Sequence, residues 1–190
     1  MEQKLQTKVT PENQKDFYRS LYKDSRTLVD LDQLPVSEYL LVDCNQEQYR
    51  KKYPNLDIVL LTTLSTAKQF NLSRDQFDYL IDNRVHNDLH WPKIPTTSCA
   101  VIFDYSILLK YLTVPEIINV LEDVSGHYGP AIILLRSSLF FIDDYRSVDR
   151  FYNLVDIKID NYVIEKFYYD TPTTELMIQF KIKHHYDNPN

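Results

Sequence analysis

Two short apolar segments joined by an amphipathic segment constrain the fold of this chain more than any other feature. Residues 98–103 and 131–135 are almost entirely apolar, which is typical of strands covered on both faces. Between them, Thr113 is a predicted helix N-cap, Glu116 stands at the capping-box position, and apolar residues follow at helical spacing. Ser125-Gly126 is predicted to end this helix. Two such strands and their helix predict a parallel pair with a right-handed crossover.

The remaining segments extend this unit into one sheet. Residues 37–63 predict a second, weaker strand–helix–strand unit. Residues 155–159 alternate between apolar and charged side chains, which predicts a strand, and residues 162–169 and 175–183 flank a loop as a C-terminal hairpin. We therefore expect an α/β fold: a mixed sheet with a central parallel βαβ unit and an antiparallel C-terminal hairpin, and helices packed on the sheet.

Length and composition predict one domain. The chain has 190 residues with 44% hydrophobic side chains, enough for one buried core, so we expect a single α/β domain over 1–190 with flexible ends at 1–12 and 184–190. A further helix is predicted within 11–29 and another within 143–153, and residues 138–142 continue the strand before them or form a new one.

Charge, glycine and cysteine contents exclude several classes of function. The net charge of −6 disfavours broad binding of a phosphate backbone. There are only two glycines, Gly126 and Gly129, so no glycine-rich nucleotide loop can form and no cofactor is expected. Cys44 and Cys99 do not make a disulfide framework, and no apolar run could span a bilayer, which predicts a cytoplasmic or other intracellular protein without membrane contact.

The segment 64–82 resembles the DNA-binding helix-turn-helix. Ala67 stands where that motif needs a small residue, Asn71 where the turn requires a positive φ, and Ser73 would cap the second helix. The resemblance implies a DNA-binding regulator as an alternative function. The residues it would place on DNA are Ser73, Arg74 and Gln76. Acidic side chains in the second helix count against this alternative.

Carboxylates at the predicted strand ends give a second alternative. Asp43, Asp104 and Asp143 each follow an apolar strand, and three converging carboxylates could hold Mg²⁺ for phosphoryl or phosphodiester chemistry. Aspartate also ends strands for ordinary reasons of turn geometry. His86 and His90 have the spacing of a metal pair on a helix but lack a third ligand. We assign no catalytic residue and no metal site.

The tyrosine content leads to the preferred expectation. Fifteen tyrosines exceed what one core of this size hides, and tyrosine is enriched at protein–protein interfaces. We therefore expect a non-enzymatic protein-interaction subunit or an accessory or assembly factor, such as one from a virus or mobile element, that binds another protein or a second copy of itself. The edge hairpin 162–183 is the expected interface. Its expected interface residues are Tyr162, Tyr168, Tyr169, Met177, Gln179 and Lys181.

Overall fold

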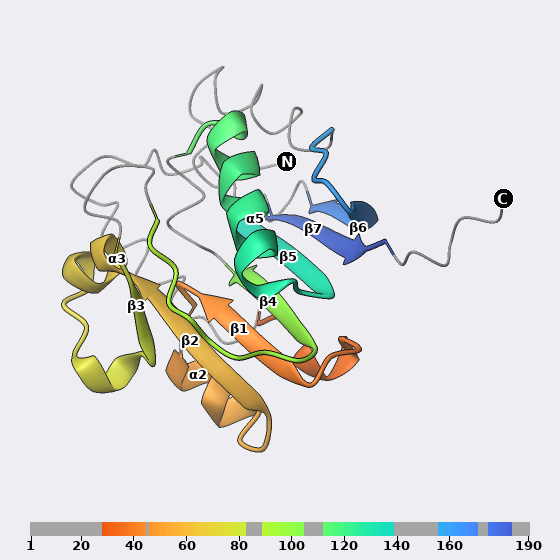
Figure 1. Cartoon of the computed structure of the whole chain (residues 1–190). Helices are drawn as coiled ribbons and strands as arrows, with labels where there is room; N and C mark the ends of the chain where they lie inside the picture. Colours follow the sequence, from red (N-terminus) through yellow and green to blue (C-terminus); the bar gives the residue numbers. More distant parts are fainter. Residues whose placement is uncertain are drawn as a thin grey trace, which may run out of the picture.

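The computed structural model describes residues 28–44, 46–82, 89–104, 112–138, 156–170 and 175–183. Their centre is a seven-stranded sheet in the order β3-β2-β1-β4-β5-β7-β6 (Figure 1). The strands are β1 Glu38–Val42, β2 Asp57–Thr63, β3 Tyr79–Ile81, β4 Cys99–Asp104, β5 Ile132–Ser138, β6 Tyr162–Asp170 and β7 Glu175–Ile182. The helices are α2 Gln46–Lys52, α3 Leu64–Gln69 and α5 Val114–Tyr128, with 3-10 turns η2 Leu31–Gln33 and η3 Arg74–Gln76.

The predicted fold class is confirmed. Strands β3, β2, β1, β4 and β5 run parallel to their neighbours, and β7 joins β5 and β6 in antiparallel pairs. Both predicted strand–helix–strand units are present, as β1-α2-β2 and β4-α5-β5. The start of α5 is also as predicted: the Thr113 hydroxyl accepts from Glu116 N, and the Glu116 carboxylate accepts from Thr113 N at 3.0 Å.

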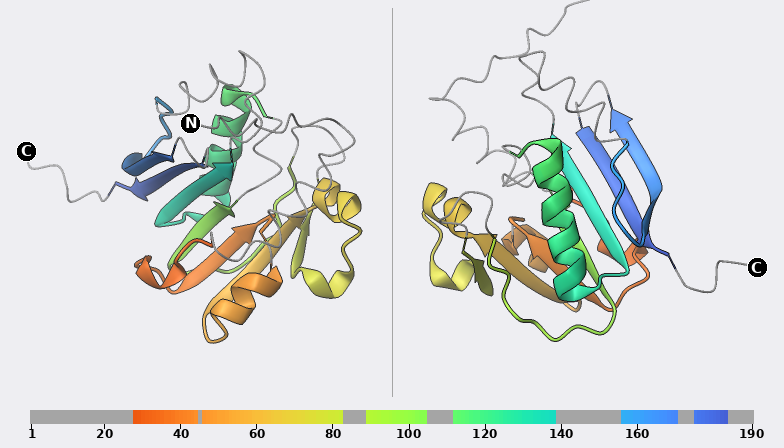
Figure 2. Two further views of the ribbon diagram at one scale, coloured as in Figure 1. Left: turned by 180° about the vertical axis from the view of Figure 1, so that it is seen from behind. Right: turned by 45° about the horizontal axis from the view of Figure 1, so that its top comes forward.

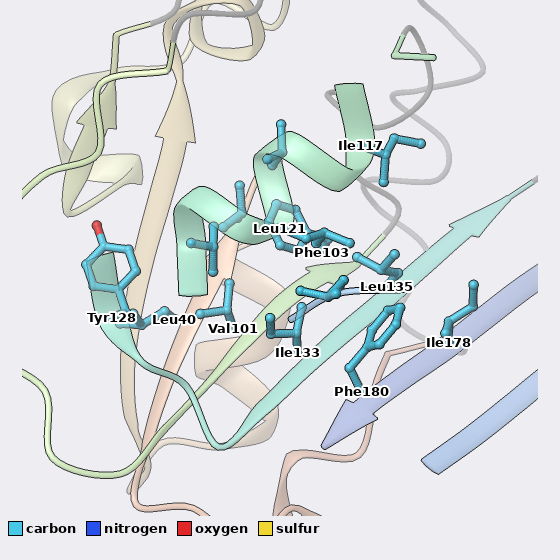
Figure 3. Packing of buried hydrophobic residues seen from close by; sticks show 14 of the residues in the cluster. Leu40, Val101, Phe103, Ile117, Leu121, Tyr128, Ile133, Leu135, Ile178 and Phe180 are labelled. Carbon is cyan, nitrogen blue, oxygen red and sulfur yellow. The ribbon is translucent and has the colours of Figure 1, made fainter. Parts of the chain in front are cut away.

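Two apolar clusters lie on opposite faces of the sheet. The helix α5 covers one face, and α2 covers the other, as the two views of Figure 1 and Figure 2 show together. Figure 3 shows the α5 side, where Leu121 packs with Val101 and Phe103 of β4 and with Ile133 and Leu135 of β5. Because alternate residues of each central strand enter opposite clusters, both faces are buried and the strands read as continuous apolar runs.

The end of α5 differs from the prediction. The helix continues past Gly126 to Tyr128, whose ring is buried and whose hydroxyl donates to Pro92 O at 2.6 Å. Gly129 instead takes the left-handed conformation, with φ +53°, and its N–H donates to Ser125 O. The buried tyrosine thus favours one further turn of helix, and the second glycine ends it.

The predicted strand over 155–159 is wrong. Its described part is irregular, although Ile157 and Ile159 are buried in the cluster under α5. The alternation in the sequence therefore records which side chains are buried and not a strand, because no described strand pairs with this segment.

The helix-turn-helix prediction is also wrong. Asn71 has the expected positive φ of 51°, but the segment after it forms only the three-residue turn η3. The chain then enters β3, which pairs with β2 in parallel. Parallel pairing along an existing strand satisfies the backbone groups of 79–81, and this outweighs the weak helical pattern. A three-residue turn cannot serve as a recognition helix.

Several predicted elements fall outside the described residues: most of the helix within 11–29, the strand at 138–142 beyond Ser138, and the helix within 143–153. The single-domain boundaries and flexible ends stay predictions. None of the helices in the described ranges is long and apolar enough to cross a membrane.

Candidate functional site at the carboxyl edge of the sheet

The order of the sheet reverses between β1 and β4. The chain leaves β1 toward β2 and β3, and it leaves β4 in the opposite direction, toward β5. In open parallel sheets, ligands bind outside the carboxyl ends of the strands at such a reversal. Three polar residues stand there: Asp43 directly follows β1, Thr63 ends β2 and Asp104 ends β4. All three are buried.

Asp43 turns its carboxylate into the edge of the sheet. Its backbone has φ +54°, a conformation that aspartate tolerates better than most residues, and its N–H continues the ladder by donating to Leu61 O. One carboxylate oxygen accepts from Thr63 N at 2.8 Å, and the other accepts from the Thr63 hydroxyl at 2.9 Å. Burial at 2% exposure raises the pKa of Asp43 to about 6, although the bonds from Thr63 and Thr66 oppose the shift.

Asp104 lies among partners from two other elements. The Tyr49 hydroxyl of α2 donates to one of its carboxylate oxygens, and Arg136 Nη1 of β5 lies 3.8 Å from the other. Tyr49 is fully buried and also accepts a hydrogen bond from Val29 N at 3.1 Å. Burial and the negative charge of Asp104 hold the pKa of Tyr49 well above its usual range, so this hydroxyl keeps its proton.

The charges of both Asp43 and Asp104 act on Cys44. Its thiol is buried, and its Sγ lies 3.6 Å from Ile102 O. Burial, then the charge of Asp104 and, to a smaller extent, that of Asp43 raise the pKa of this thiol well above its usual range. The carboxyls at the ends of β1 and β4 therefore both influence the pKa of the same buried thiol. A cluster of perturbed ionisable groups at the ligand-binding edge of a sheet is typical of a functional site.

The sequence identified two of these residues and missed the others. Asp43 and Asp104 do lie at the ends of parallel strands, as predicted, whereas Asp143 and His86 fall outside the described residues. No group of three metal-binding side chains occurs within the described ranges, so the structure gives the Mg²⁺ interpretation no support there. The residues that sequence reasoning missed are Tyr49, Thr63, Cys44 and Arg136. For Thr63 a signal existed, since the predicted strand–helix–strand unit 37–63 ends at this residue.

The residues predicted to contact DNA serve the local turn. Ser73 N donates to the Gln76 side chain at 2.8 Å, and Arg74 Nη1 donates to Phe77 O at 3.0 Å. Both of these bonds stabilise the turn into β3. This arrangement gives a structural role to each of the three residues.

The predicted interface residues divide between core and surface. Tyr162 is buried and its hydroxyl donates to Pro130 O at 2.5 Å, and Gln179 is buried with its amide donating to Glu165. Met177 is half-buried. Tyr168 and Lys181 are exposed, and the side chain of Tyr169 lies outside the described part. The hairpin exists, but only part of the predicted set faces solvent.

No protein-family model matches this chain, and no curated protein matches it. Among solved structures, it is similar to a TehB-like SAM-dependent methyltransferase from Corynebacterium glutamicum, with 11% identity and a TM-score of 0.48 over 90% of this chain and 97% of that one. It is also similar to a magnesium protoporphyrin IX methyltransferase from Synechocystis with bound SAH, with 8% identity and a TM-score of 0.45 over 88% and 94%. At TM-scores below 0.5, these likenesses say nothing about substrates or site residues.

The order of the sheet, with its parallel centre and its reversal between β1 and β4, is that of a Rossmann-like fold. The prediction of a non-enzymatic interaction subunit or accessory factor is corrected by this comparison, because the neighbours are enzymes.

The candidate site brings charged groups of both signs together. The edge offers the carboxyls of Asp43 and Asp104 with the guanidinium of Arg136. The Thr62 hydroxyl is buried and has no hydrogen-bond partner within the described part of the chain.

Proposed function

We propose that this chain is an enzyme of the methyltransferase class that binds a sulfonium methyl donor at the carboxyl edge of the sheet, between β1 and β4. The observation that carries the proposal is the reversal of strand order between these two strands, with a buried carboxyl at the end of each. When bound, such a donor supplies an electrophilic methyl group to a nucleophilic atom of a substrate.

The chain's own residues would position the donor by charge. S-adenosylmethionine (SAM), the donor we propose, carries positive charges on its sulfonium and its ammonium group. Asp104 is held from two other elements, because Tyr49 of α2 donates to it and Arg136 of β5 lies beside it. These fixed partners keep the carboxylate oriented, as an electrostatic binding site requires. Asp43 differs, since burial raises its pKa to about 6, so above that pH it adds a second negative charge at this edge.

Buried surroundings strengthen these charges. The carboxyls are flanked by the Cys44 thiol and by apolar strand residues, and water is therefore largely replaced by protein around them. In such an environment a carboxylate attracts a cation more strongly than it does in water. We also propose a reducing compartment as the place of action, because both cysteines are buried free thiols.

Equilibrium binding of SAM and of S-adenosylhomocysteine (SAH) to the purified chain tests the proposal. We expect both to bind, and NAD and ATP not to bind, because no glycine loop accommodates phosphate. Asp104→Asn should weaken SAM at least about tenfold, which corresponds to about 1.4 kcal/mol. SAH lacks the sulfonium charge, so its loss should be smaller.

A matched variant controls for nonspecific loss of charge. Asp57→Asn removes an exposed carboxyl at the amino end of β2, on the opposite edge of the sheet, and should leave both affinities unchanged. Thermal unfolding checks that each variant is folded. The proposal fails if neither compound binds at millimolar concentration, or if the Asp104 and Asp57 variants lose affinity equally.

A further inference from the structure

The strand β6 forms an outer edge of the sheet and carries exposed apolar side chains. It ends the strand order and, within the described residues, pairs with β7 alone. The exposed large apolar side chains of β6 are Val163 at 44%, Ile164 at 36%, Phe167 at 43% and Tyr168 at 48%. Edge strands of this kind pair readily with another strand unless charges or bulges prevent it.

A β-bulge at Glu165 changes which residues share a face. In a regular strand, Ile164 and Phe167 would point to opposite faces because their separation is odd. Here Ile164 pairs with Phe180 and Phe167 pairs with Ile178, and both of these partners belong to the core cluster under α5. The bulge therefore brings Ile164 and Phe167 to the same face of the sheet.

The other face shows the same effect. Val163 pairs with Lys181 and Tyr168 pairs with Met177, and Lys181 and Met177 lie on the side of β7 that faces away from the α5 cluster. Val163 and Tyr168 therefore share this second face, although their sequence separation is again odd. Both are exposed.

The two charged residues at the bulge also share this second face. Lys166 pairs with Gln179, and the Glu165 carboxylate accepts a hydrogen bond from the Gln179 amide at 2.9 Å. Glu165 and Lys166 thus stand next to each other on one side of the strand, both exposed to solvent.

This arrangement is complementary to itself. Two antiparallel strands related by a two-fold axis place residues of the same face opposite one another. With the axis between residues 165 and 166, Glu165 lies opposite Lys166 of the second copy. Ile164 then lies opposite Phe167 of the second copy, and Val163 lies opposite Tyr168. Each charge meets its opposite, and each apolar residue meets an apolar residue.

We propose that a second copy of this chain docks on β6, edge to edge, to form an antiparallel two-fold dimer with a continuous sheet across both subunits. The charges select this register, because a shift of one residue places Glu165 against Glu165 or Lys166 against Lys166. The bulge and the lysine, which otherwise discourage edge pairing, here permit one pairing and oppose its neighbours. The proposal is independent of the proposed function, since β6 lies away from the β1–β4 reversal.

Sedimentation equilibrium of the full chain and its charge variants tests the dimer. The average mass of the wild-type chain should rise with concentration toward twice 22.6 kDa. Glu165→Lys places two lysines opposite two lysines, and Lys166→Glu places two glutamates opposite two glutamates, so each variant alone should dimerise at least about tenfold more weakly. Lys51→Glu, a control on the exposed side of α2, should dimerise like the wild type.

Mixing the two single variants provides the decisive readout. An equimolar mixture should form a 1:1 heterodimer, because each lysine of one chain then faces a glutamate of the other. The double exchange E165K/K166E should restore the homodimer for the same reason. A wild-type monomer at all concentrations would overturn the proposal. So would a dimer whose strength is the same in every variant, or single variants that do not recover on mixing.

Discussion

Replacing the buried carboxyl at the end of β1 should make this protein more stable, relative to wild type, at neutral pH than at pH 4. Asp43 is 2% exposed, and its pKa is raised to about 6 by burial. In the unfolded chain, an aspartate has a pKa of about 3.9. Between these values the native state holds a proton that the unfolded state has lost. The stability contribution of Asp43 is therefore complete below about pH 4 and is lost as the pH rises through about 6.

The size of this effect follows from the shift. A shift of about two pKa units corresponds to about 3 kcal/mol, which is the largest change in unfolding free energy that the titration of Asp43 can cause. Asp43→Asn removes the titration and keeps acceptor oxygen for the bond from Thr63 N. Asparagine also suits the backbone φ of +54°. We expect the stability of the variant relative to wild type to rise by up to about 3 kcal/mol between pH 4 and pH 7.

Urea unfolding measured at several pH values tests this prediction. The fluorescence of Trp91, which is buried, reports the transition. With a slope of about 2 kcal/mol per molar urea, the midpoint of Asp43→Asn should move up by about 1.5 M relative to wild type over this pH range. Asp57→Asn should follow the wild-type profile closely. Parallel profiles for wild type and Asp43→Asn, or a variant that loses relative stability toward neutral pH, would refute the reasoning.

Three further predictions concern local contacts. Tyr49→Phe removes the donor to the buried carboxyl of β4 and should cost about 3 kcal/mol in urea unfolding, whereas Tyr39→Phe, which loses one bond at 3.3 Å, should cost about 1 kcal/mol or less. Gly129→Ala should cost about 1 kcal/mol because the backbone at this position has a φ of +53°. Gly126→Ala should stabilise by up to about 1 kcal/mol, because Gly126 lies within the helix with open space around it, so the two variants should shift the thermal melt in opposite directions. Thr113→Ala should cost about 1 kcal/mol through loss of the helix cap, and an unchanged melt would contradict the capping role.

The local chemistry of the sequence predicted the centre of the sheet well. Apolar runs at 98–103 and 131–135, together with Thr113 and Glu116, located β4, α5 and β5, because strand burial and helix capping depend on residues close in the chain. The strand β3 was missed. It has only three residues, and its conformation depends on pairing with β2 about eighteen residues earlier, which no local pattern records.

The candidate site shows the same limit. Asp43 and Asp104 could be named from the sequence because they follow apolar strands. The surroundings of Asp104 could not be predicted in this way. They depend on Tyr49 and Arg136, which come from other elements and contact Asp104 only in the folded chain. The order of strands, which places the reversal between β1 and β4, is also a property of the whole sheet. Function was misjudged because composition was used where this geometry was needed.

Amide hydrogen exchange with and without SAH tests the central claim most directly, because it reports both binding and its place. Donor binding between β1 and β4 predicts slower exchange at the carboxyl ends of these strands, in residues 42–44 and 102–104, with exchange in β6 and β7 unchanged. Unchanged exchange throughout at millimolar SAH, or protection confined to other parts of the sheet, would contradict a methyl-donor site at this edge.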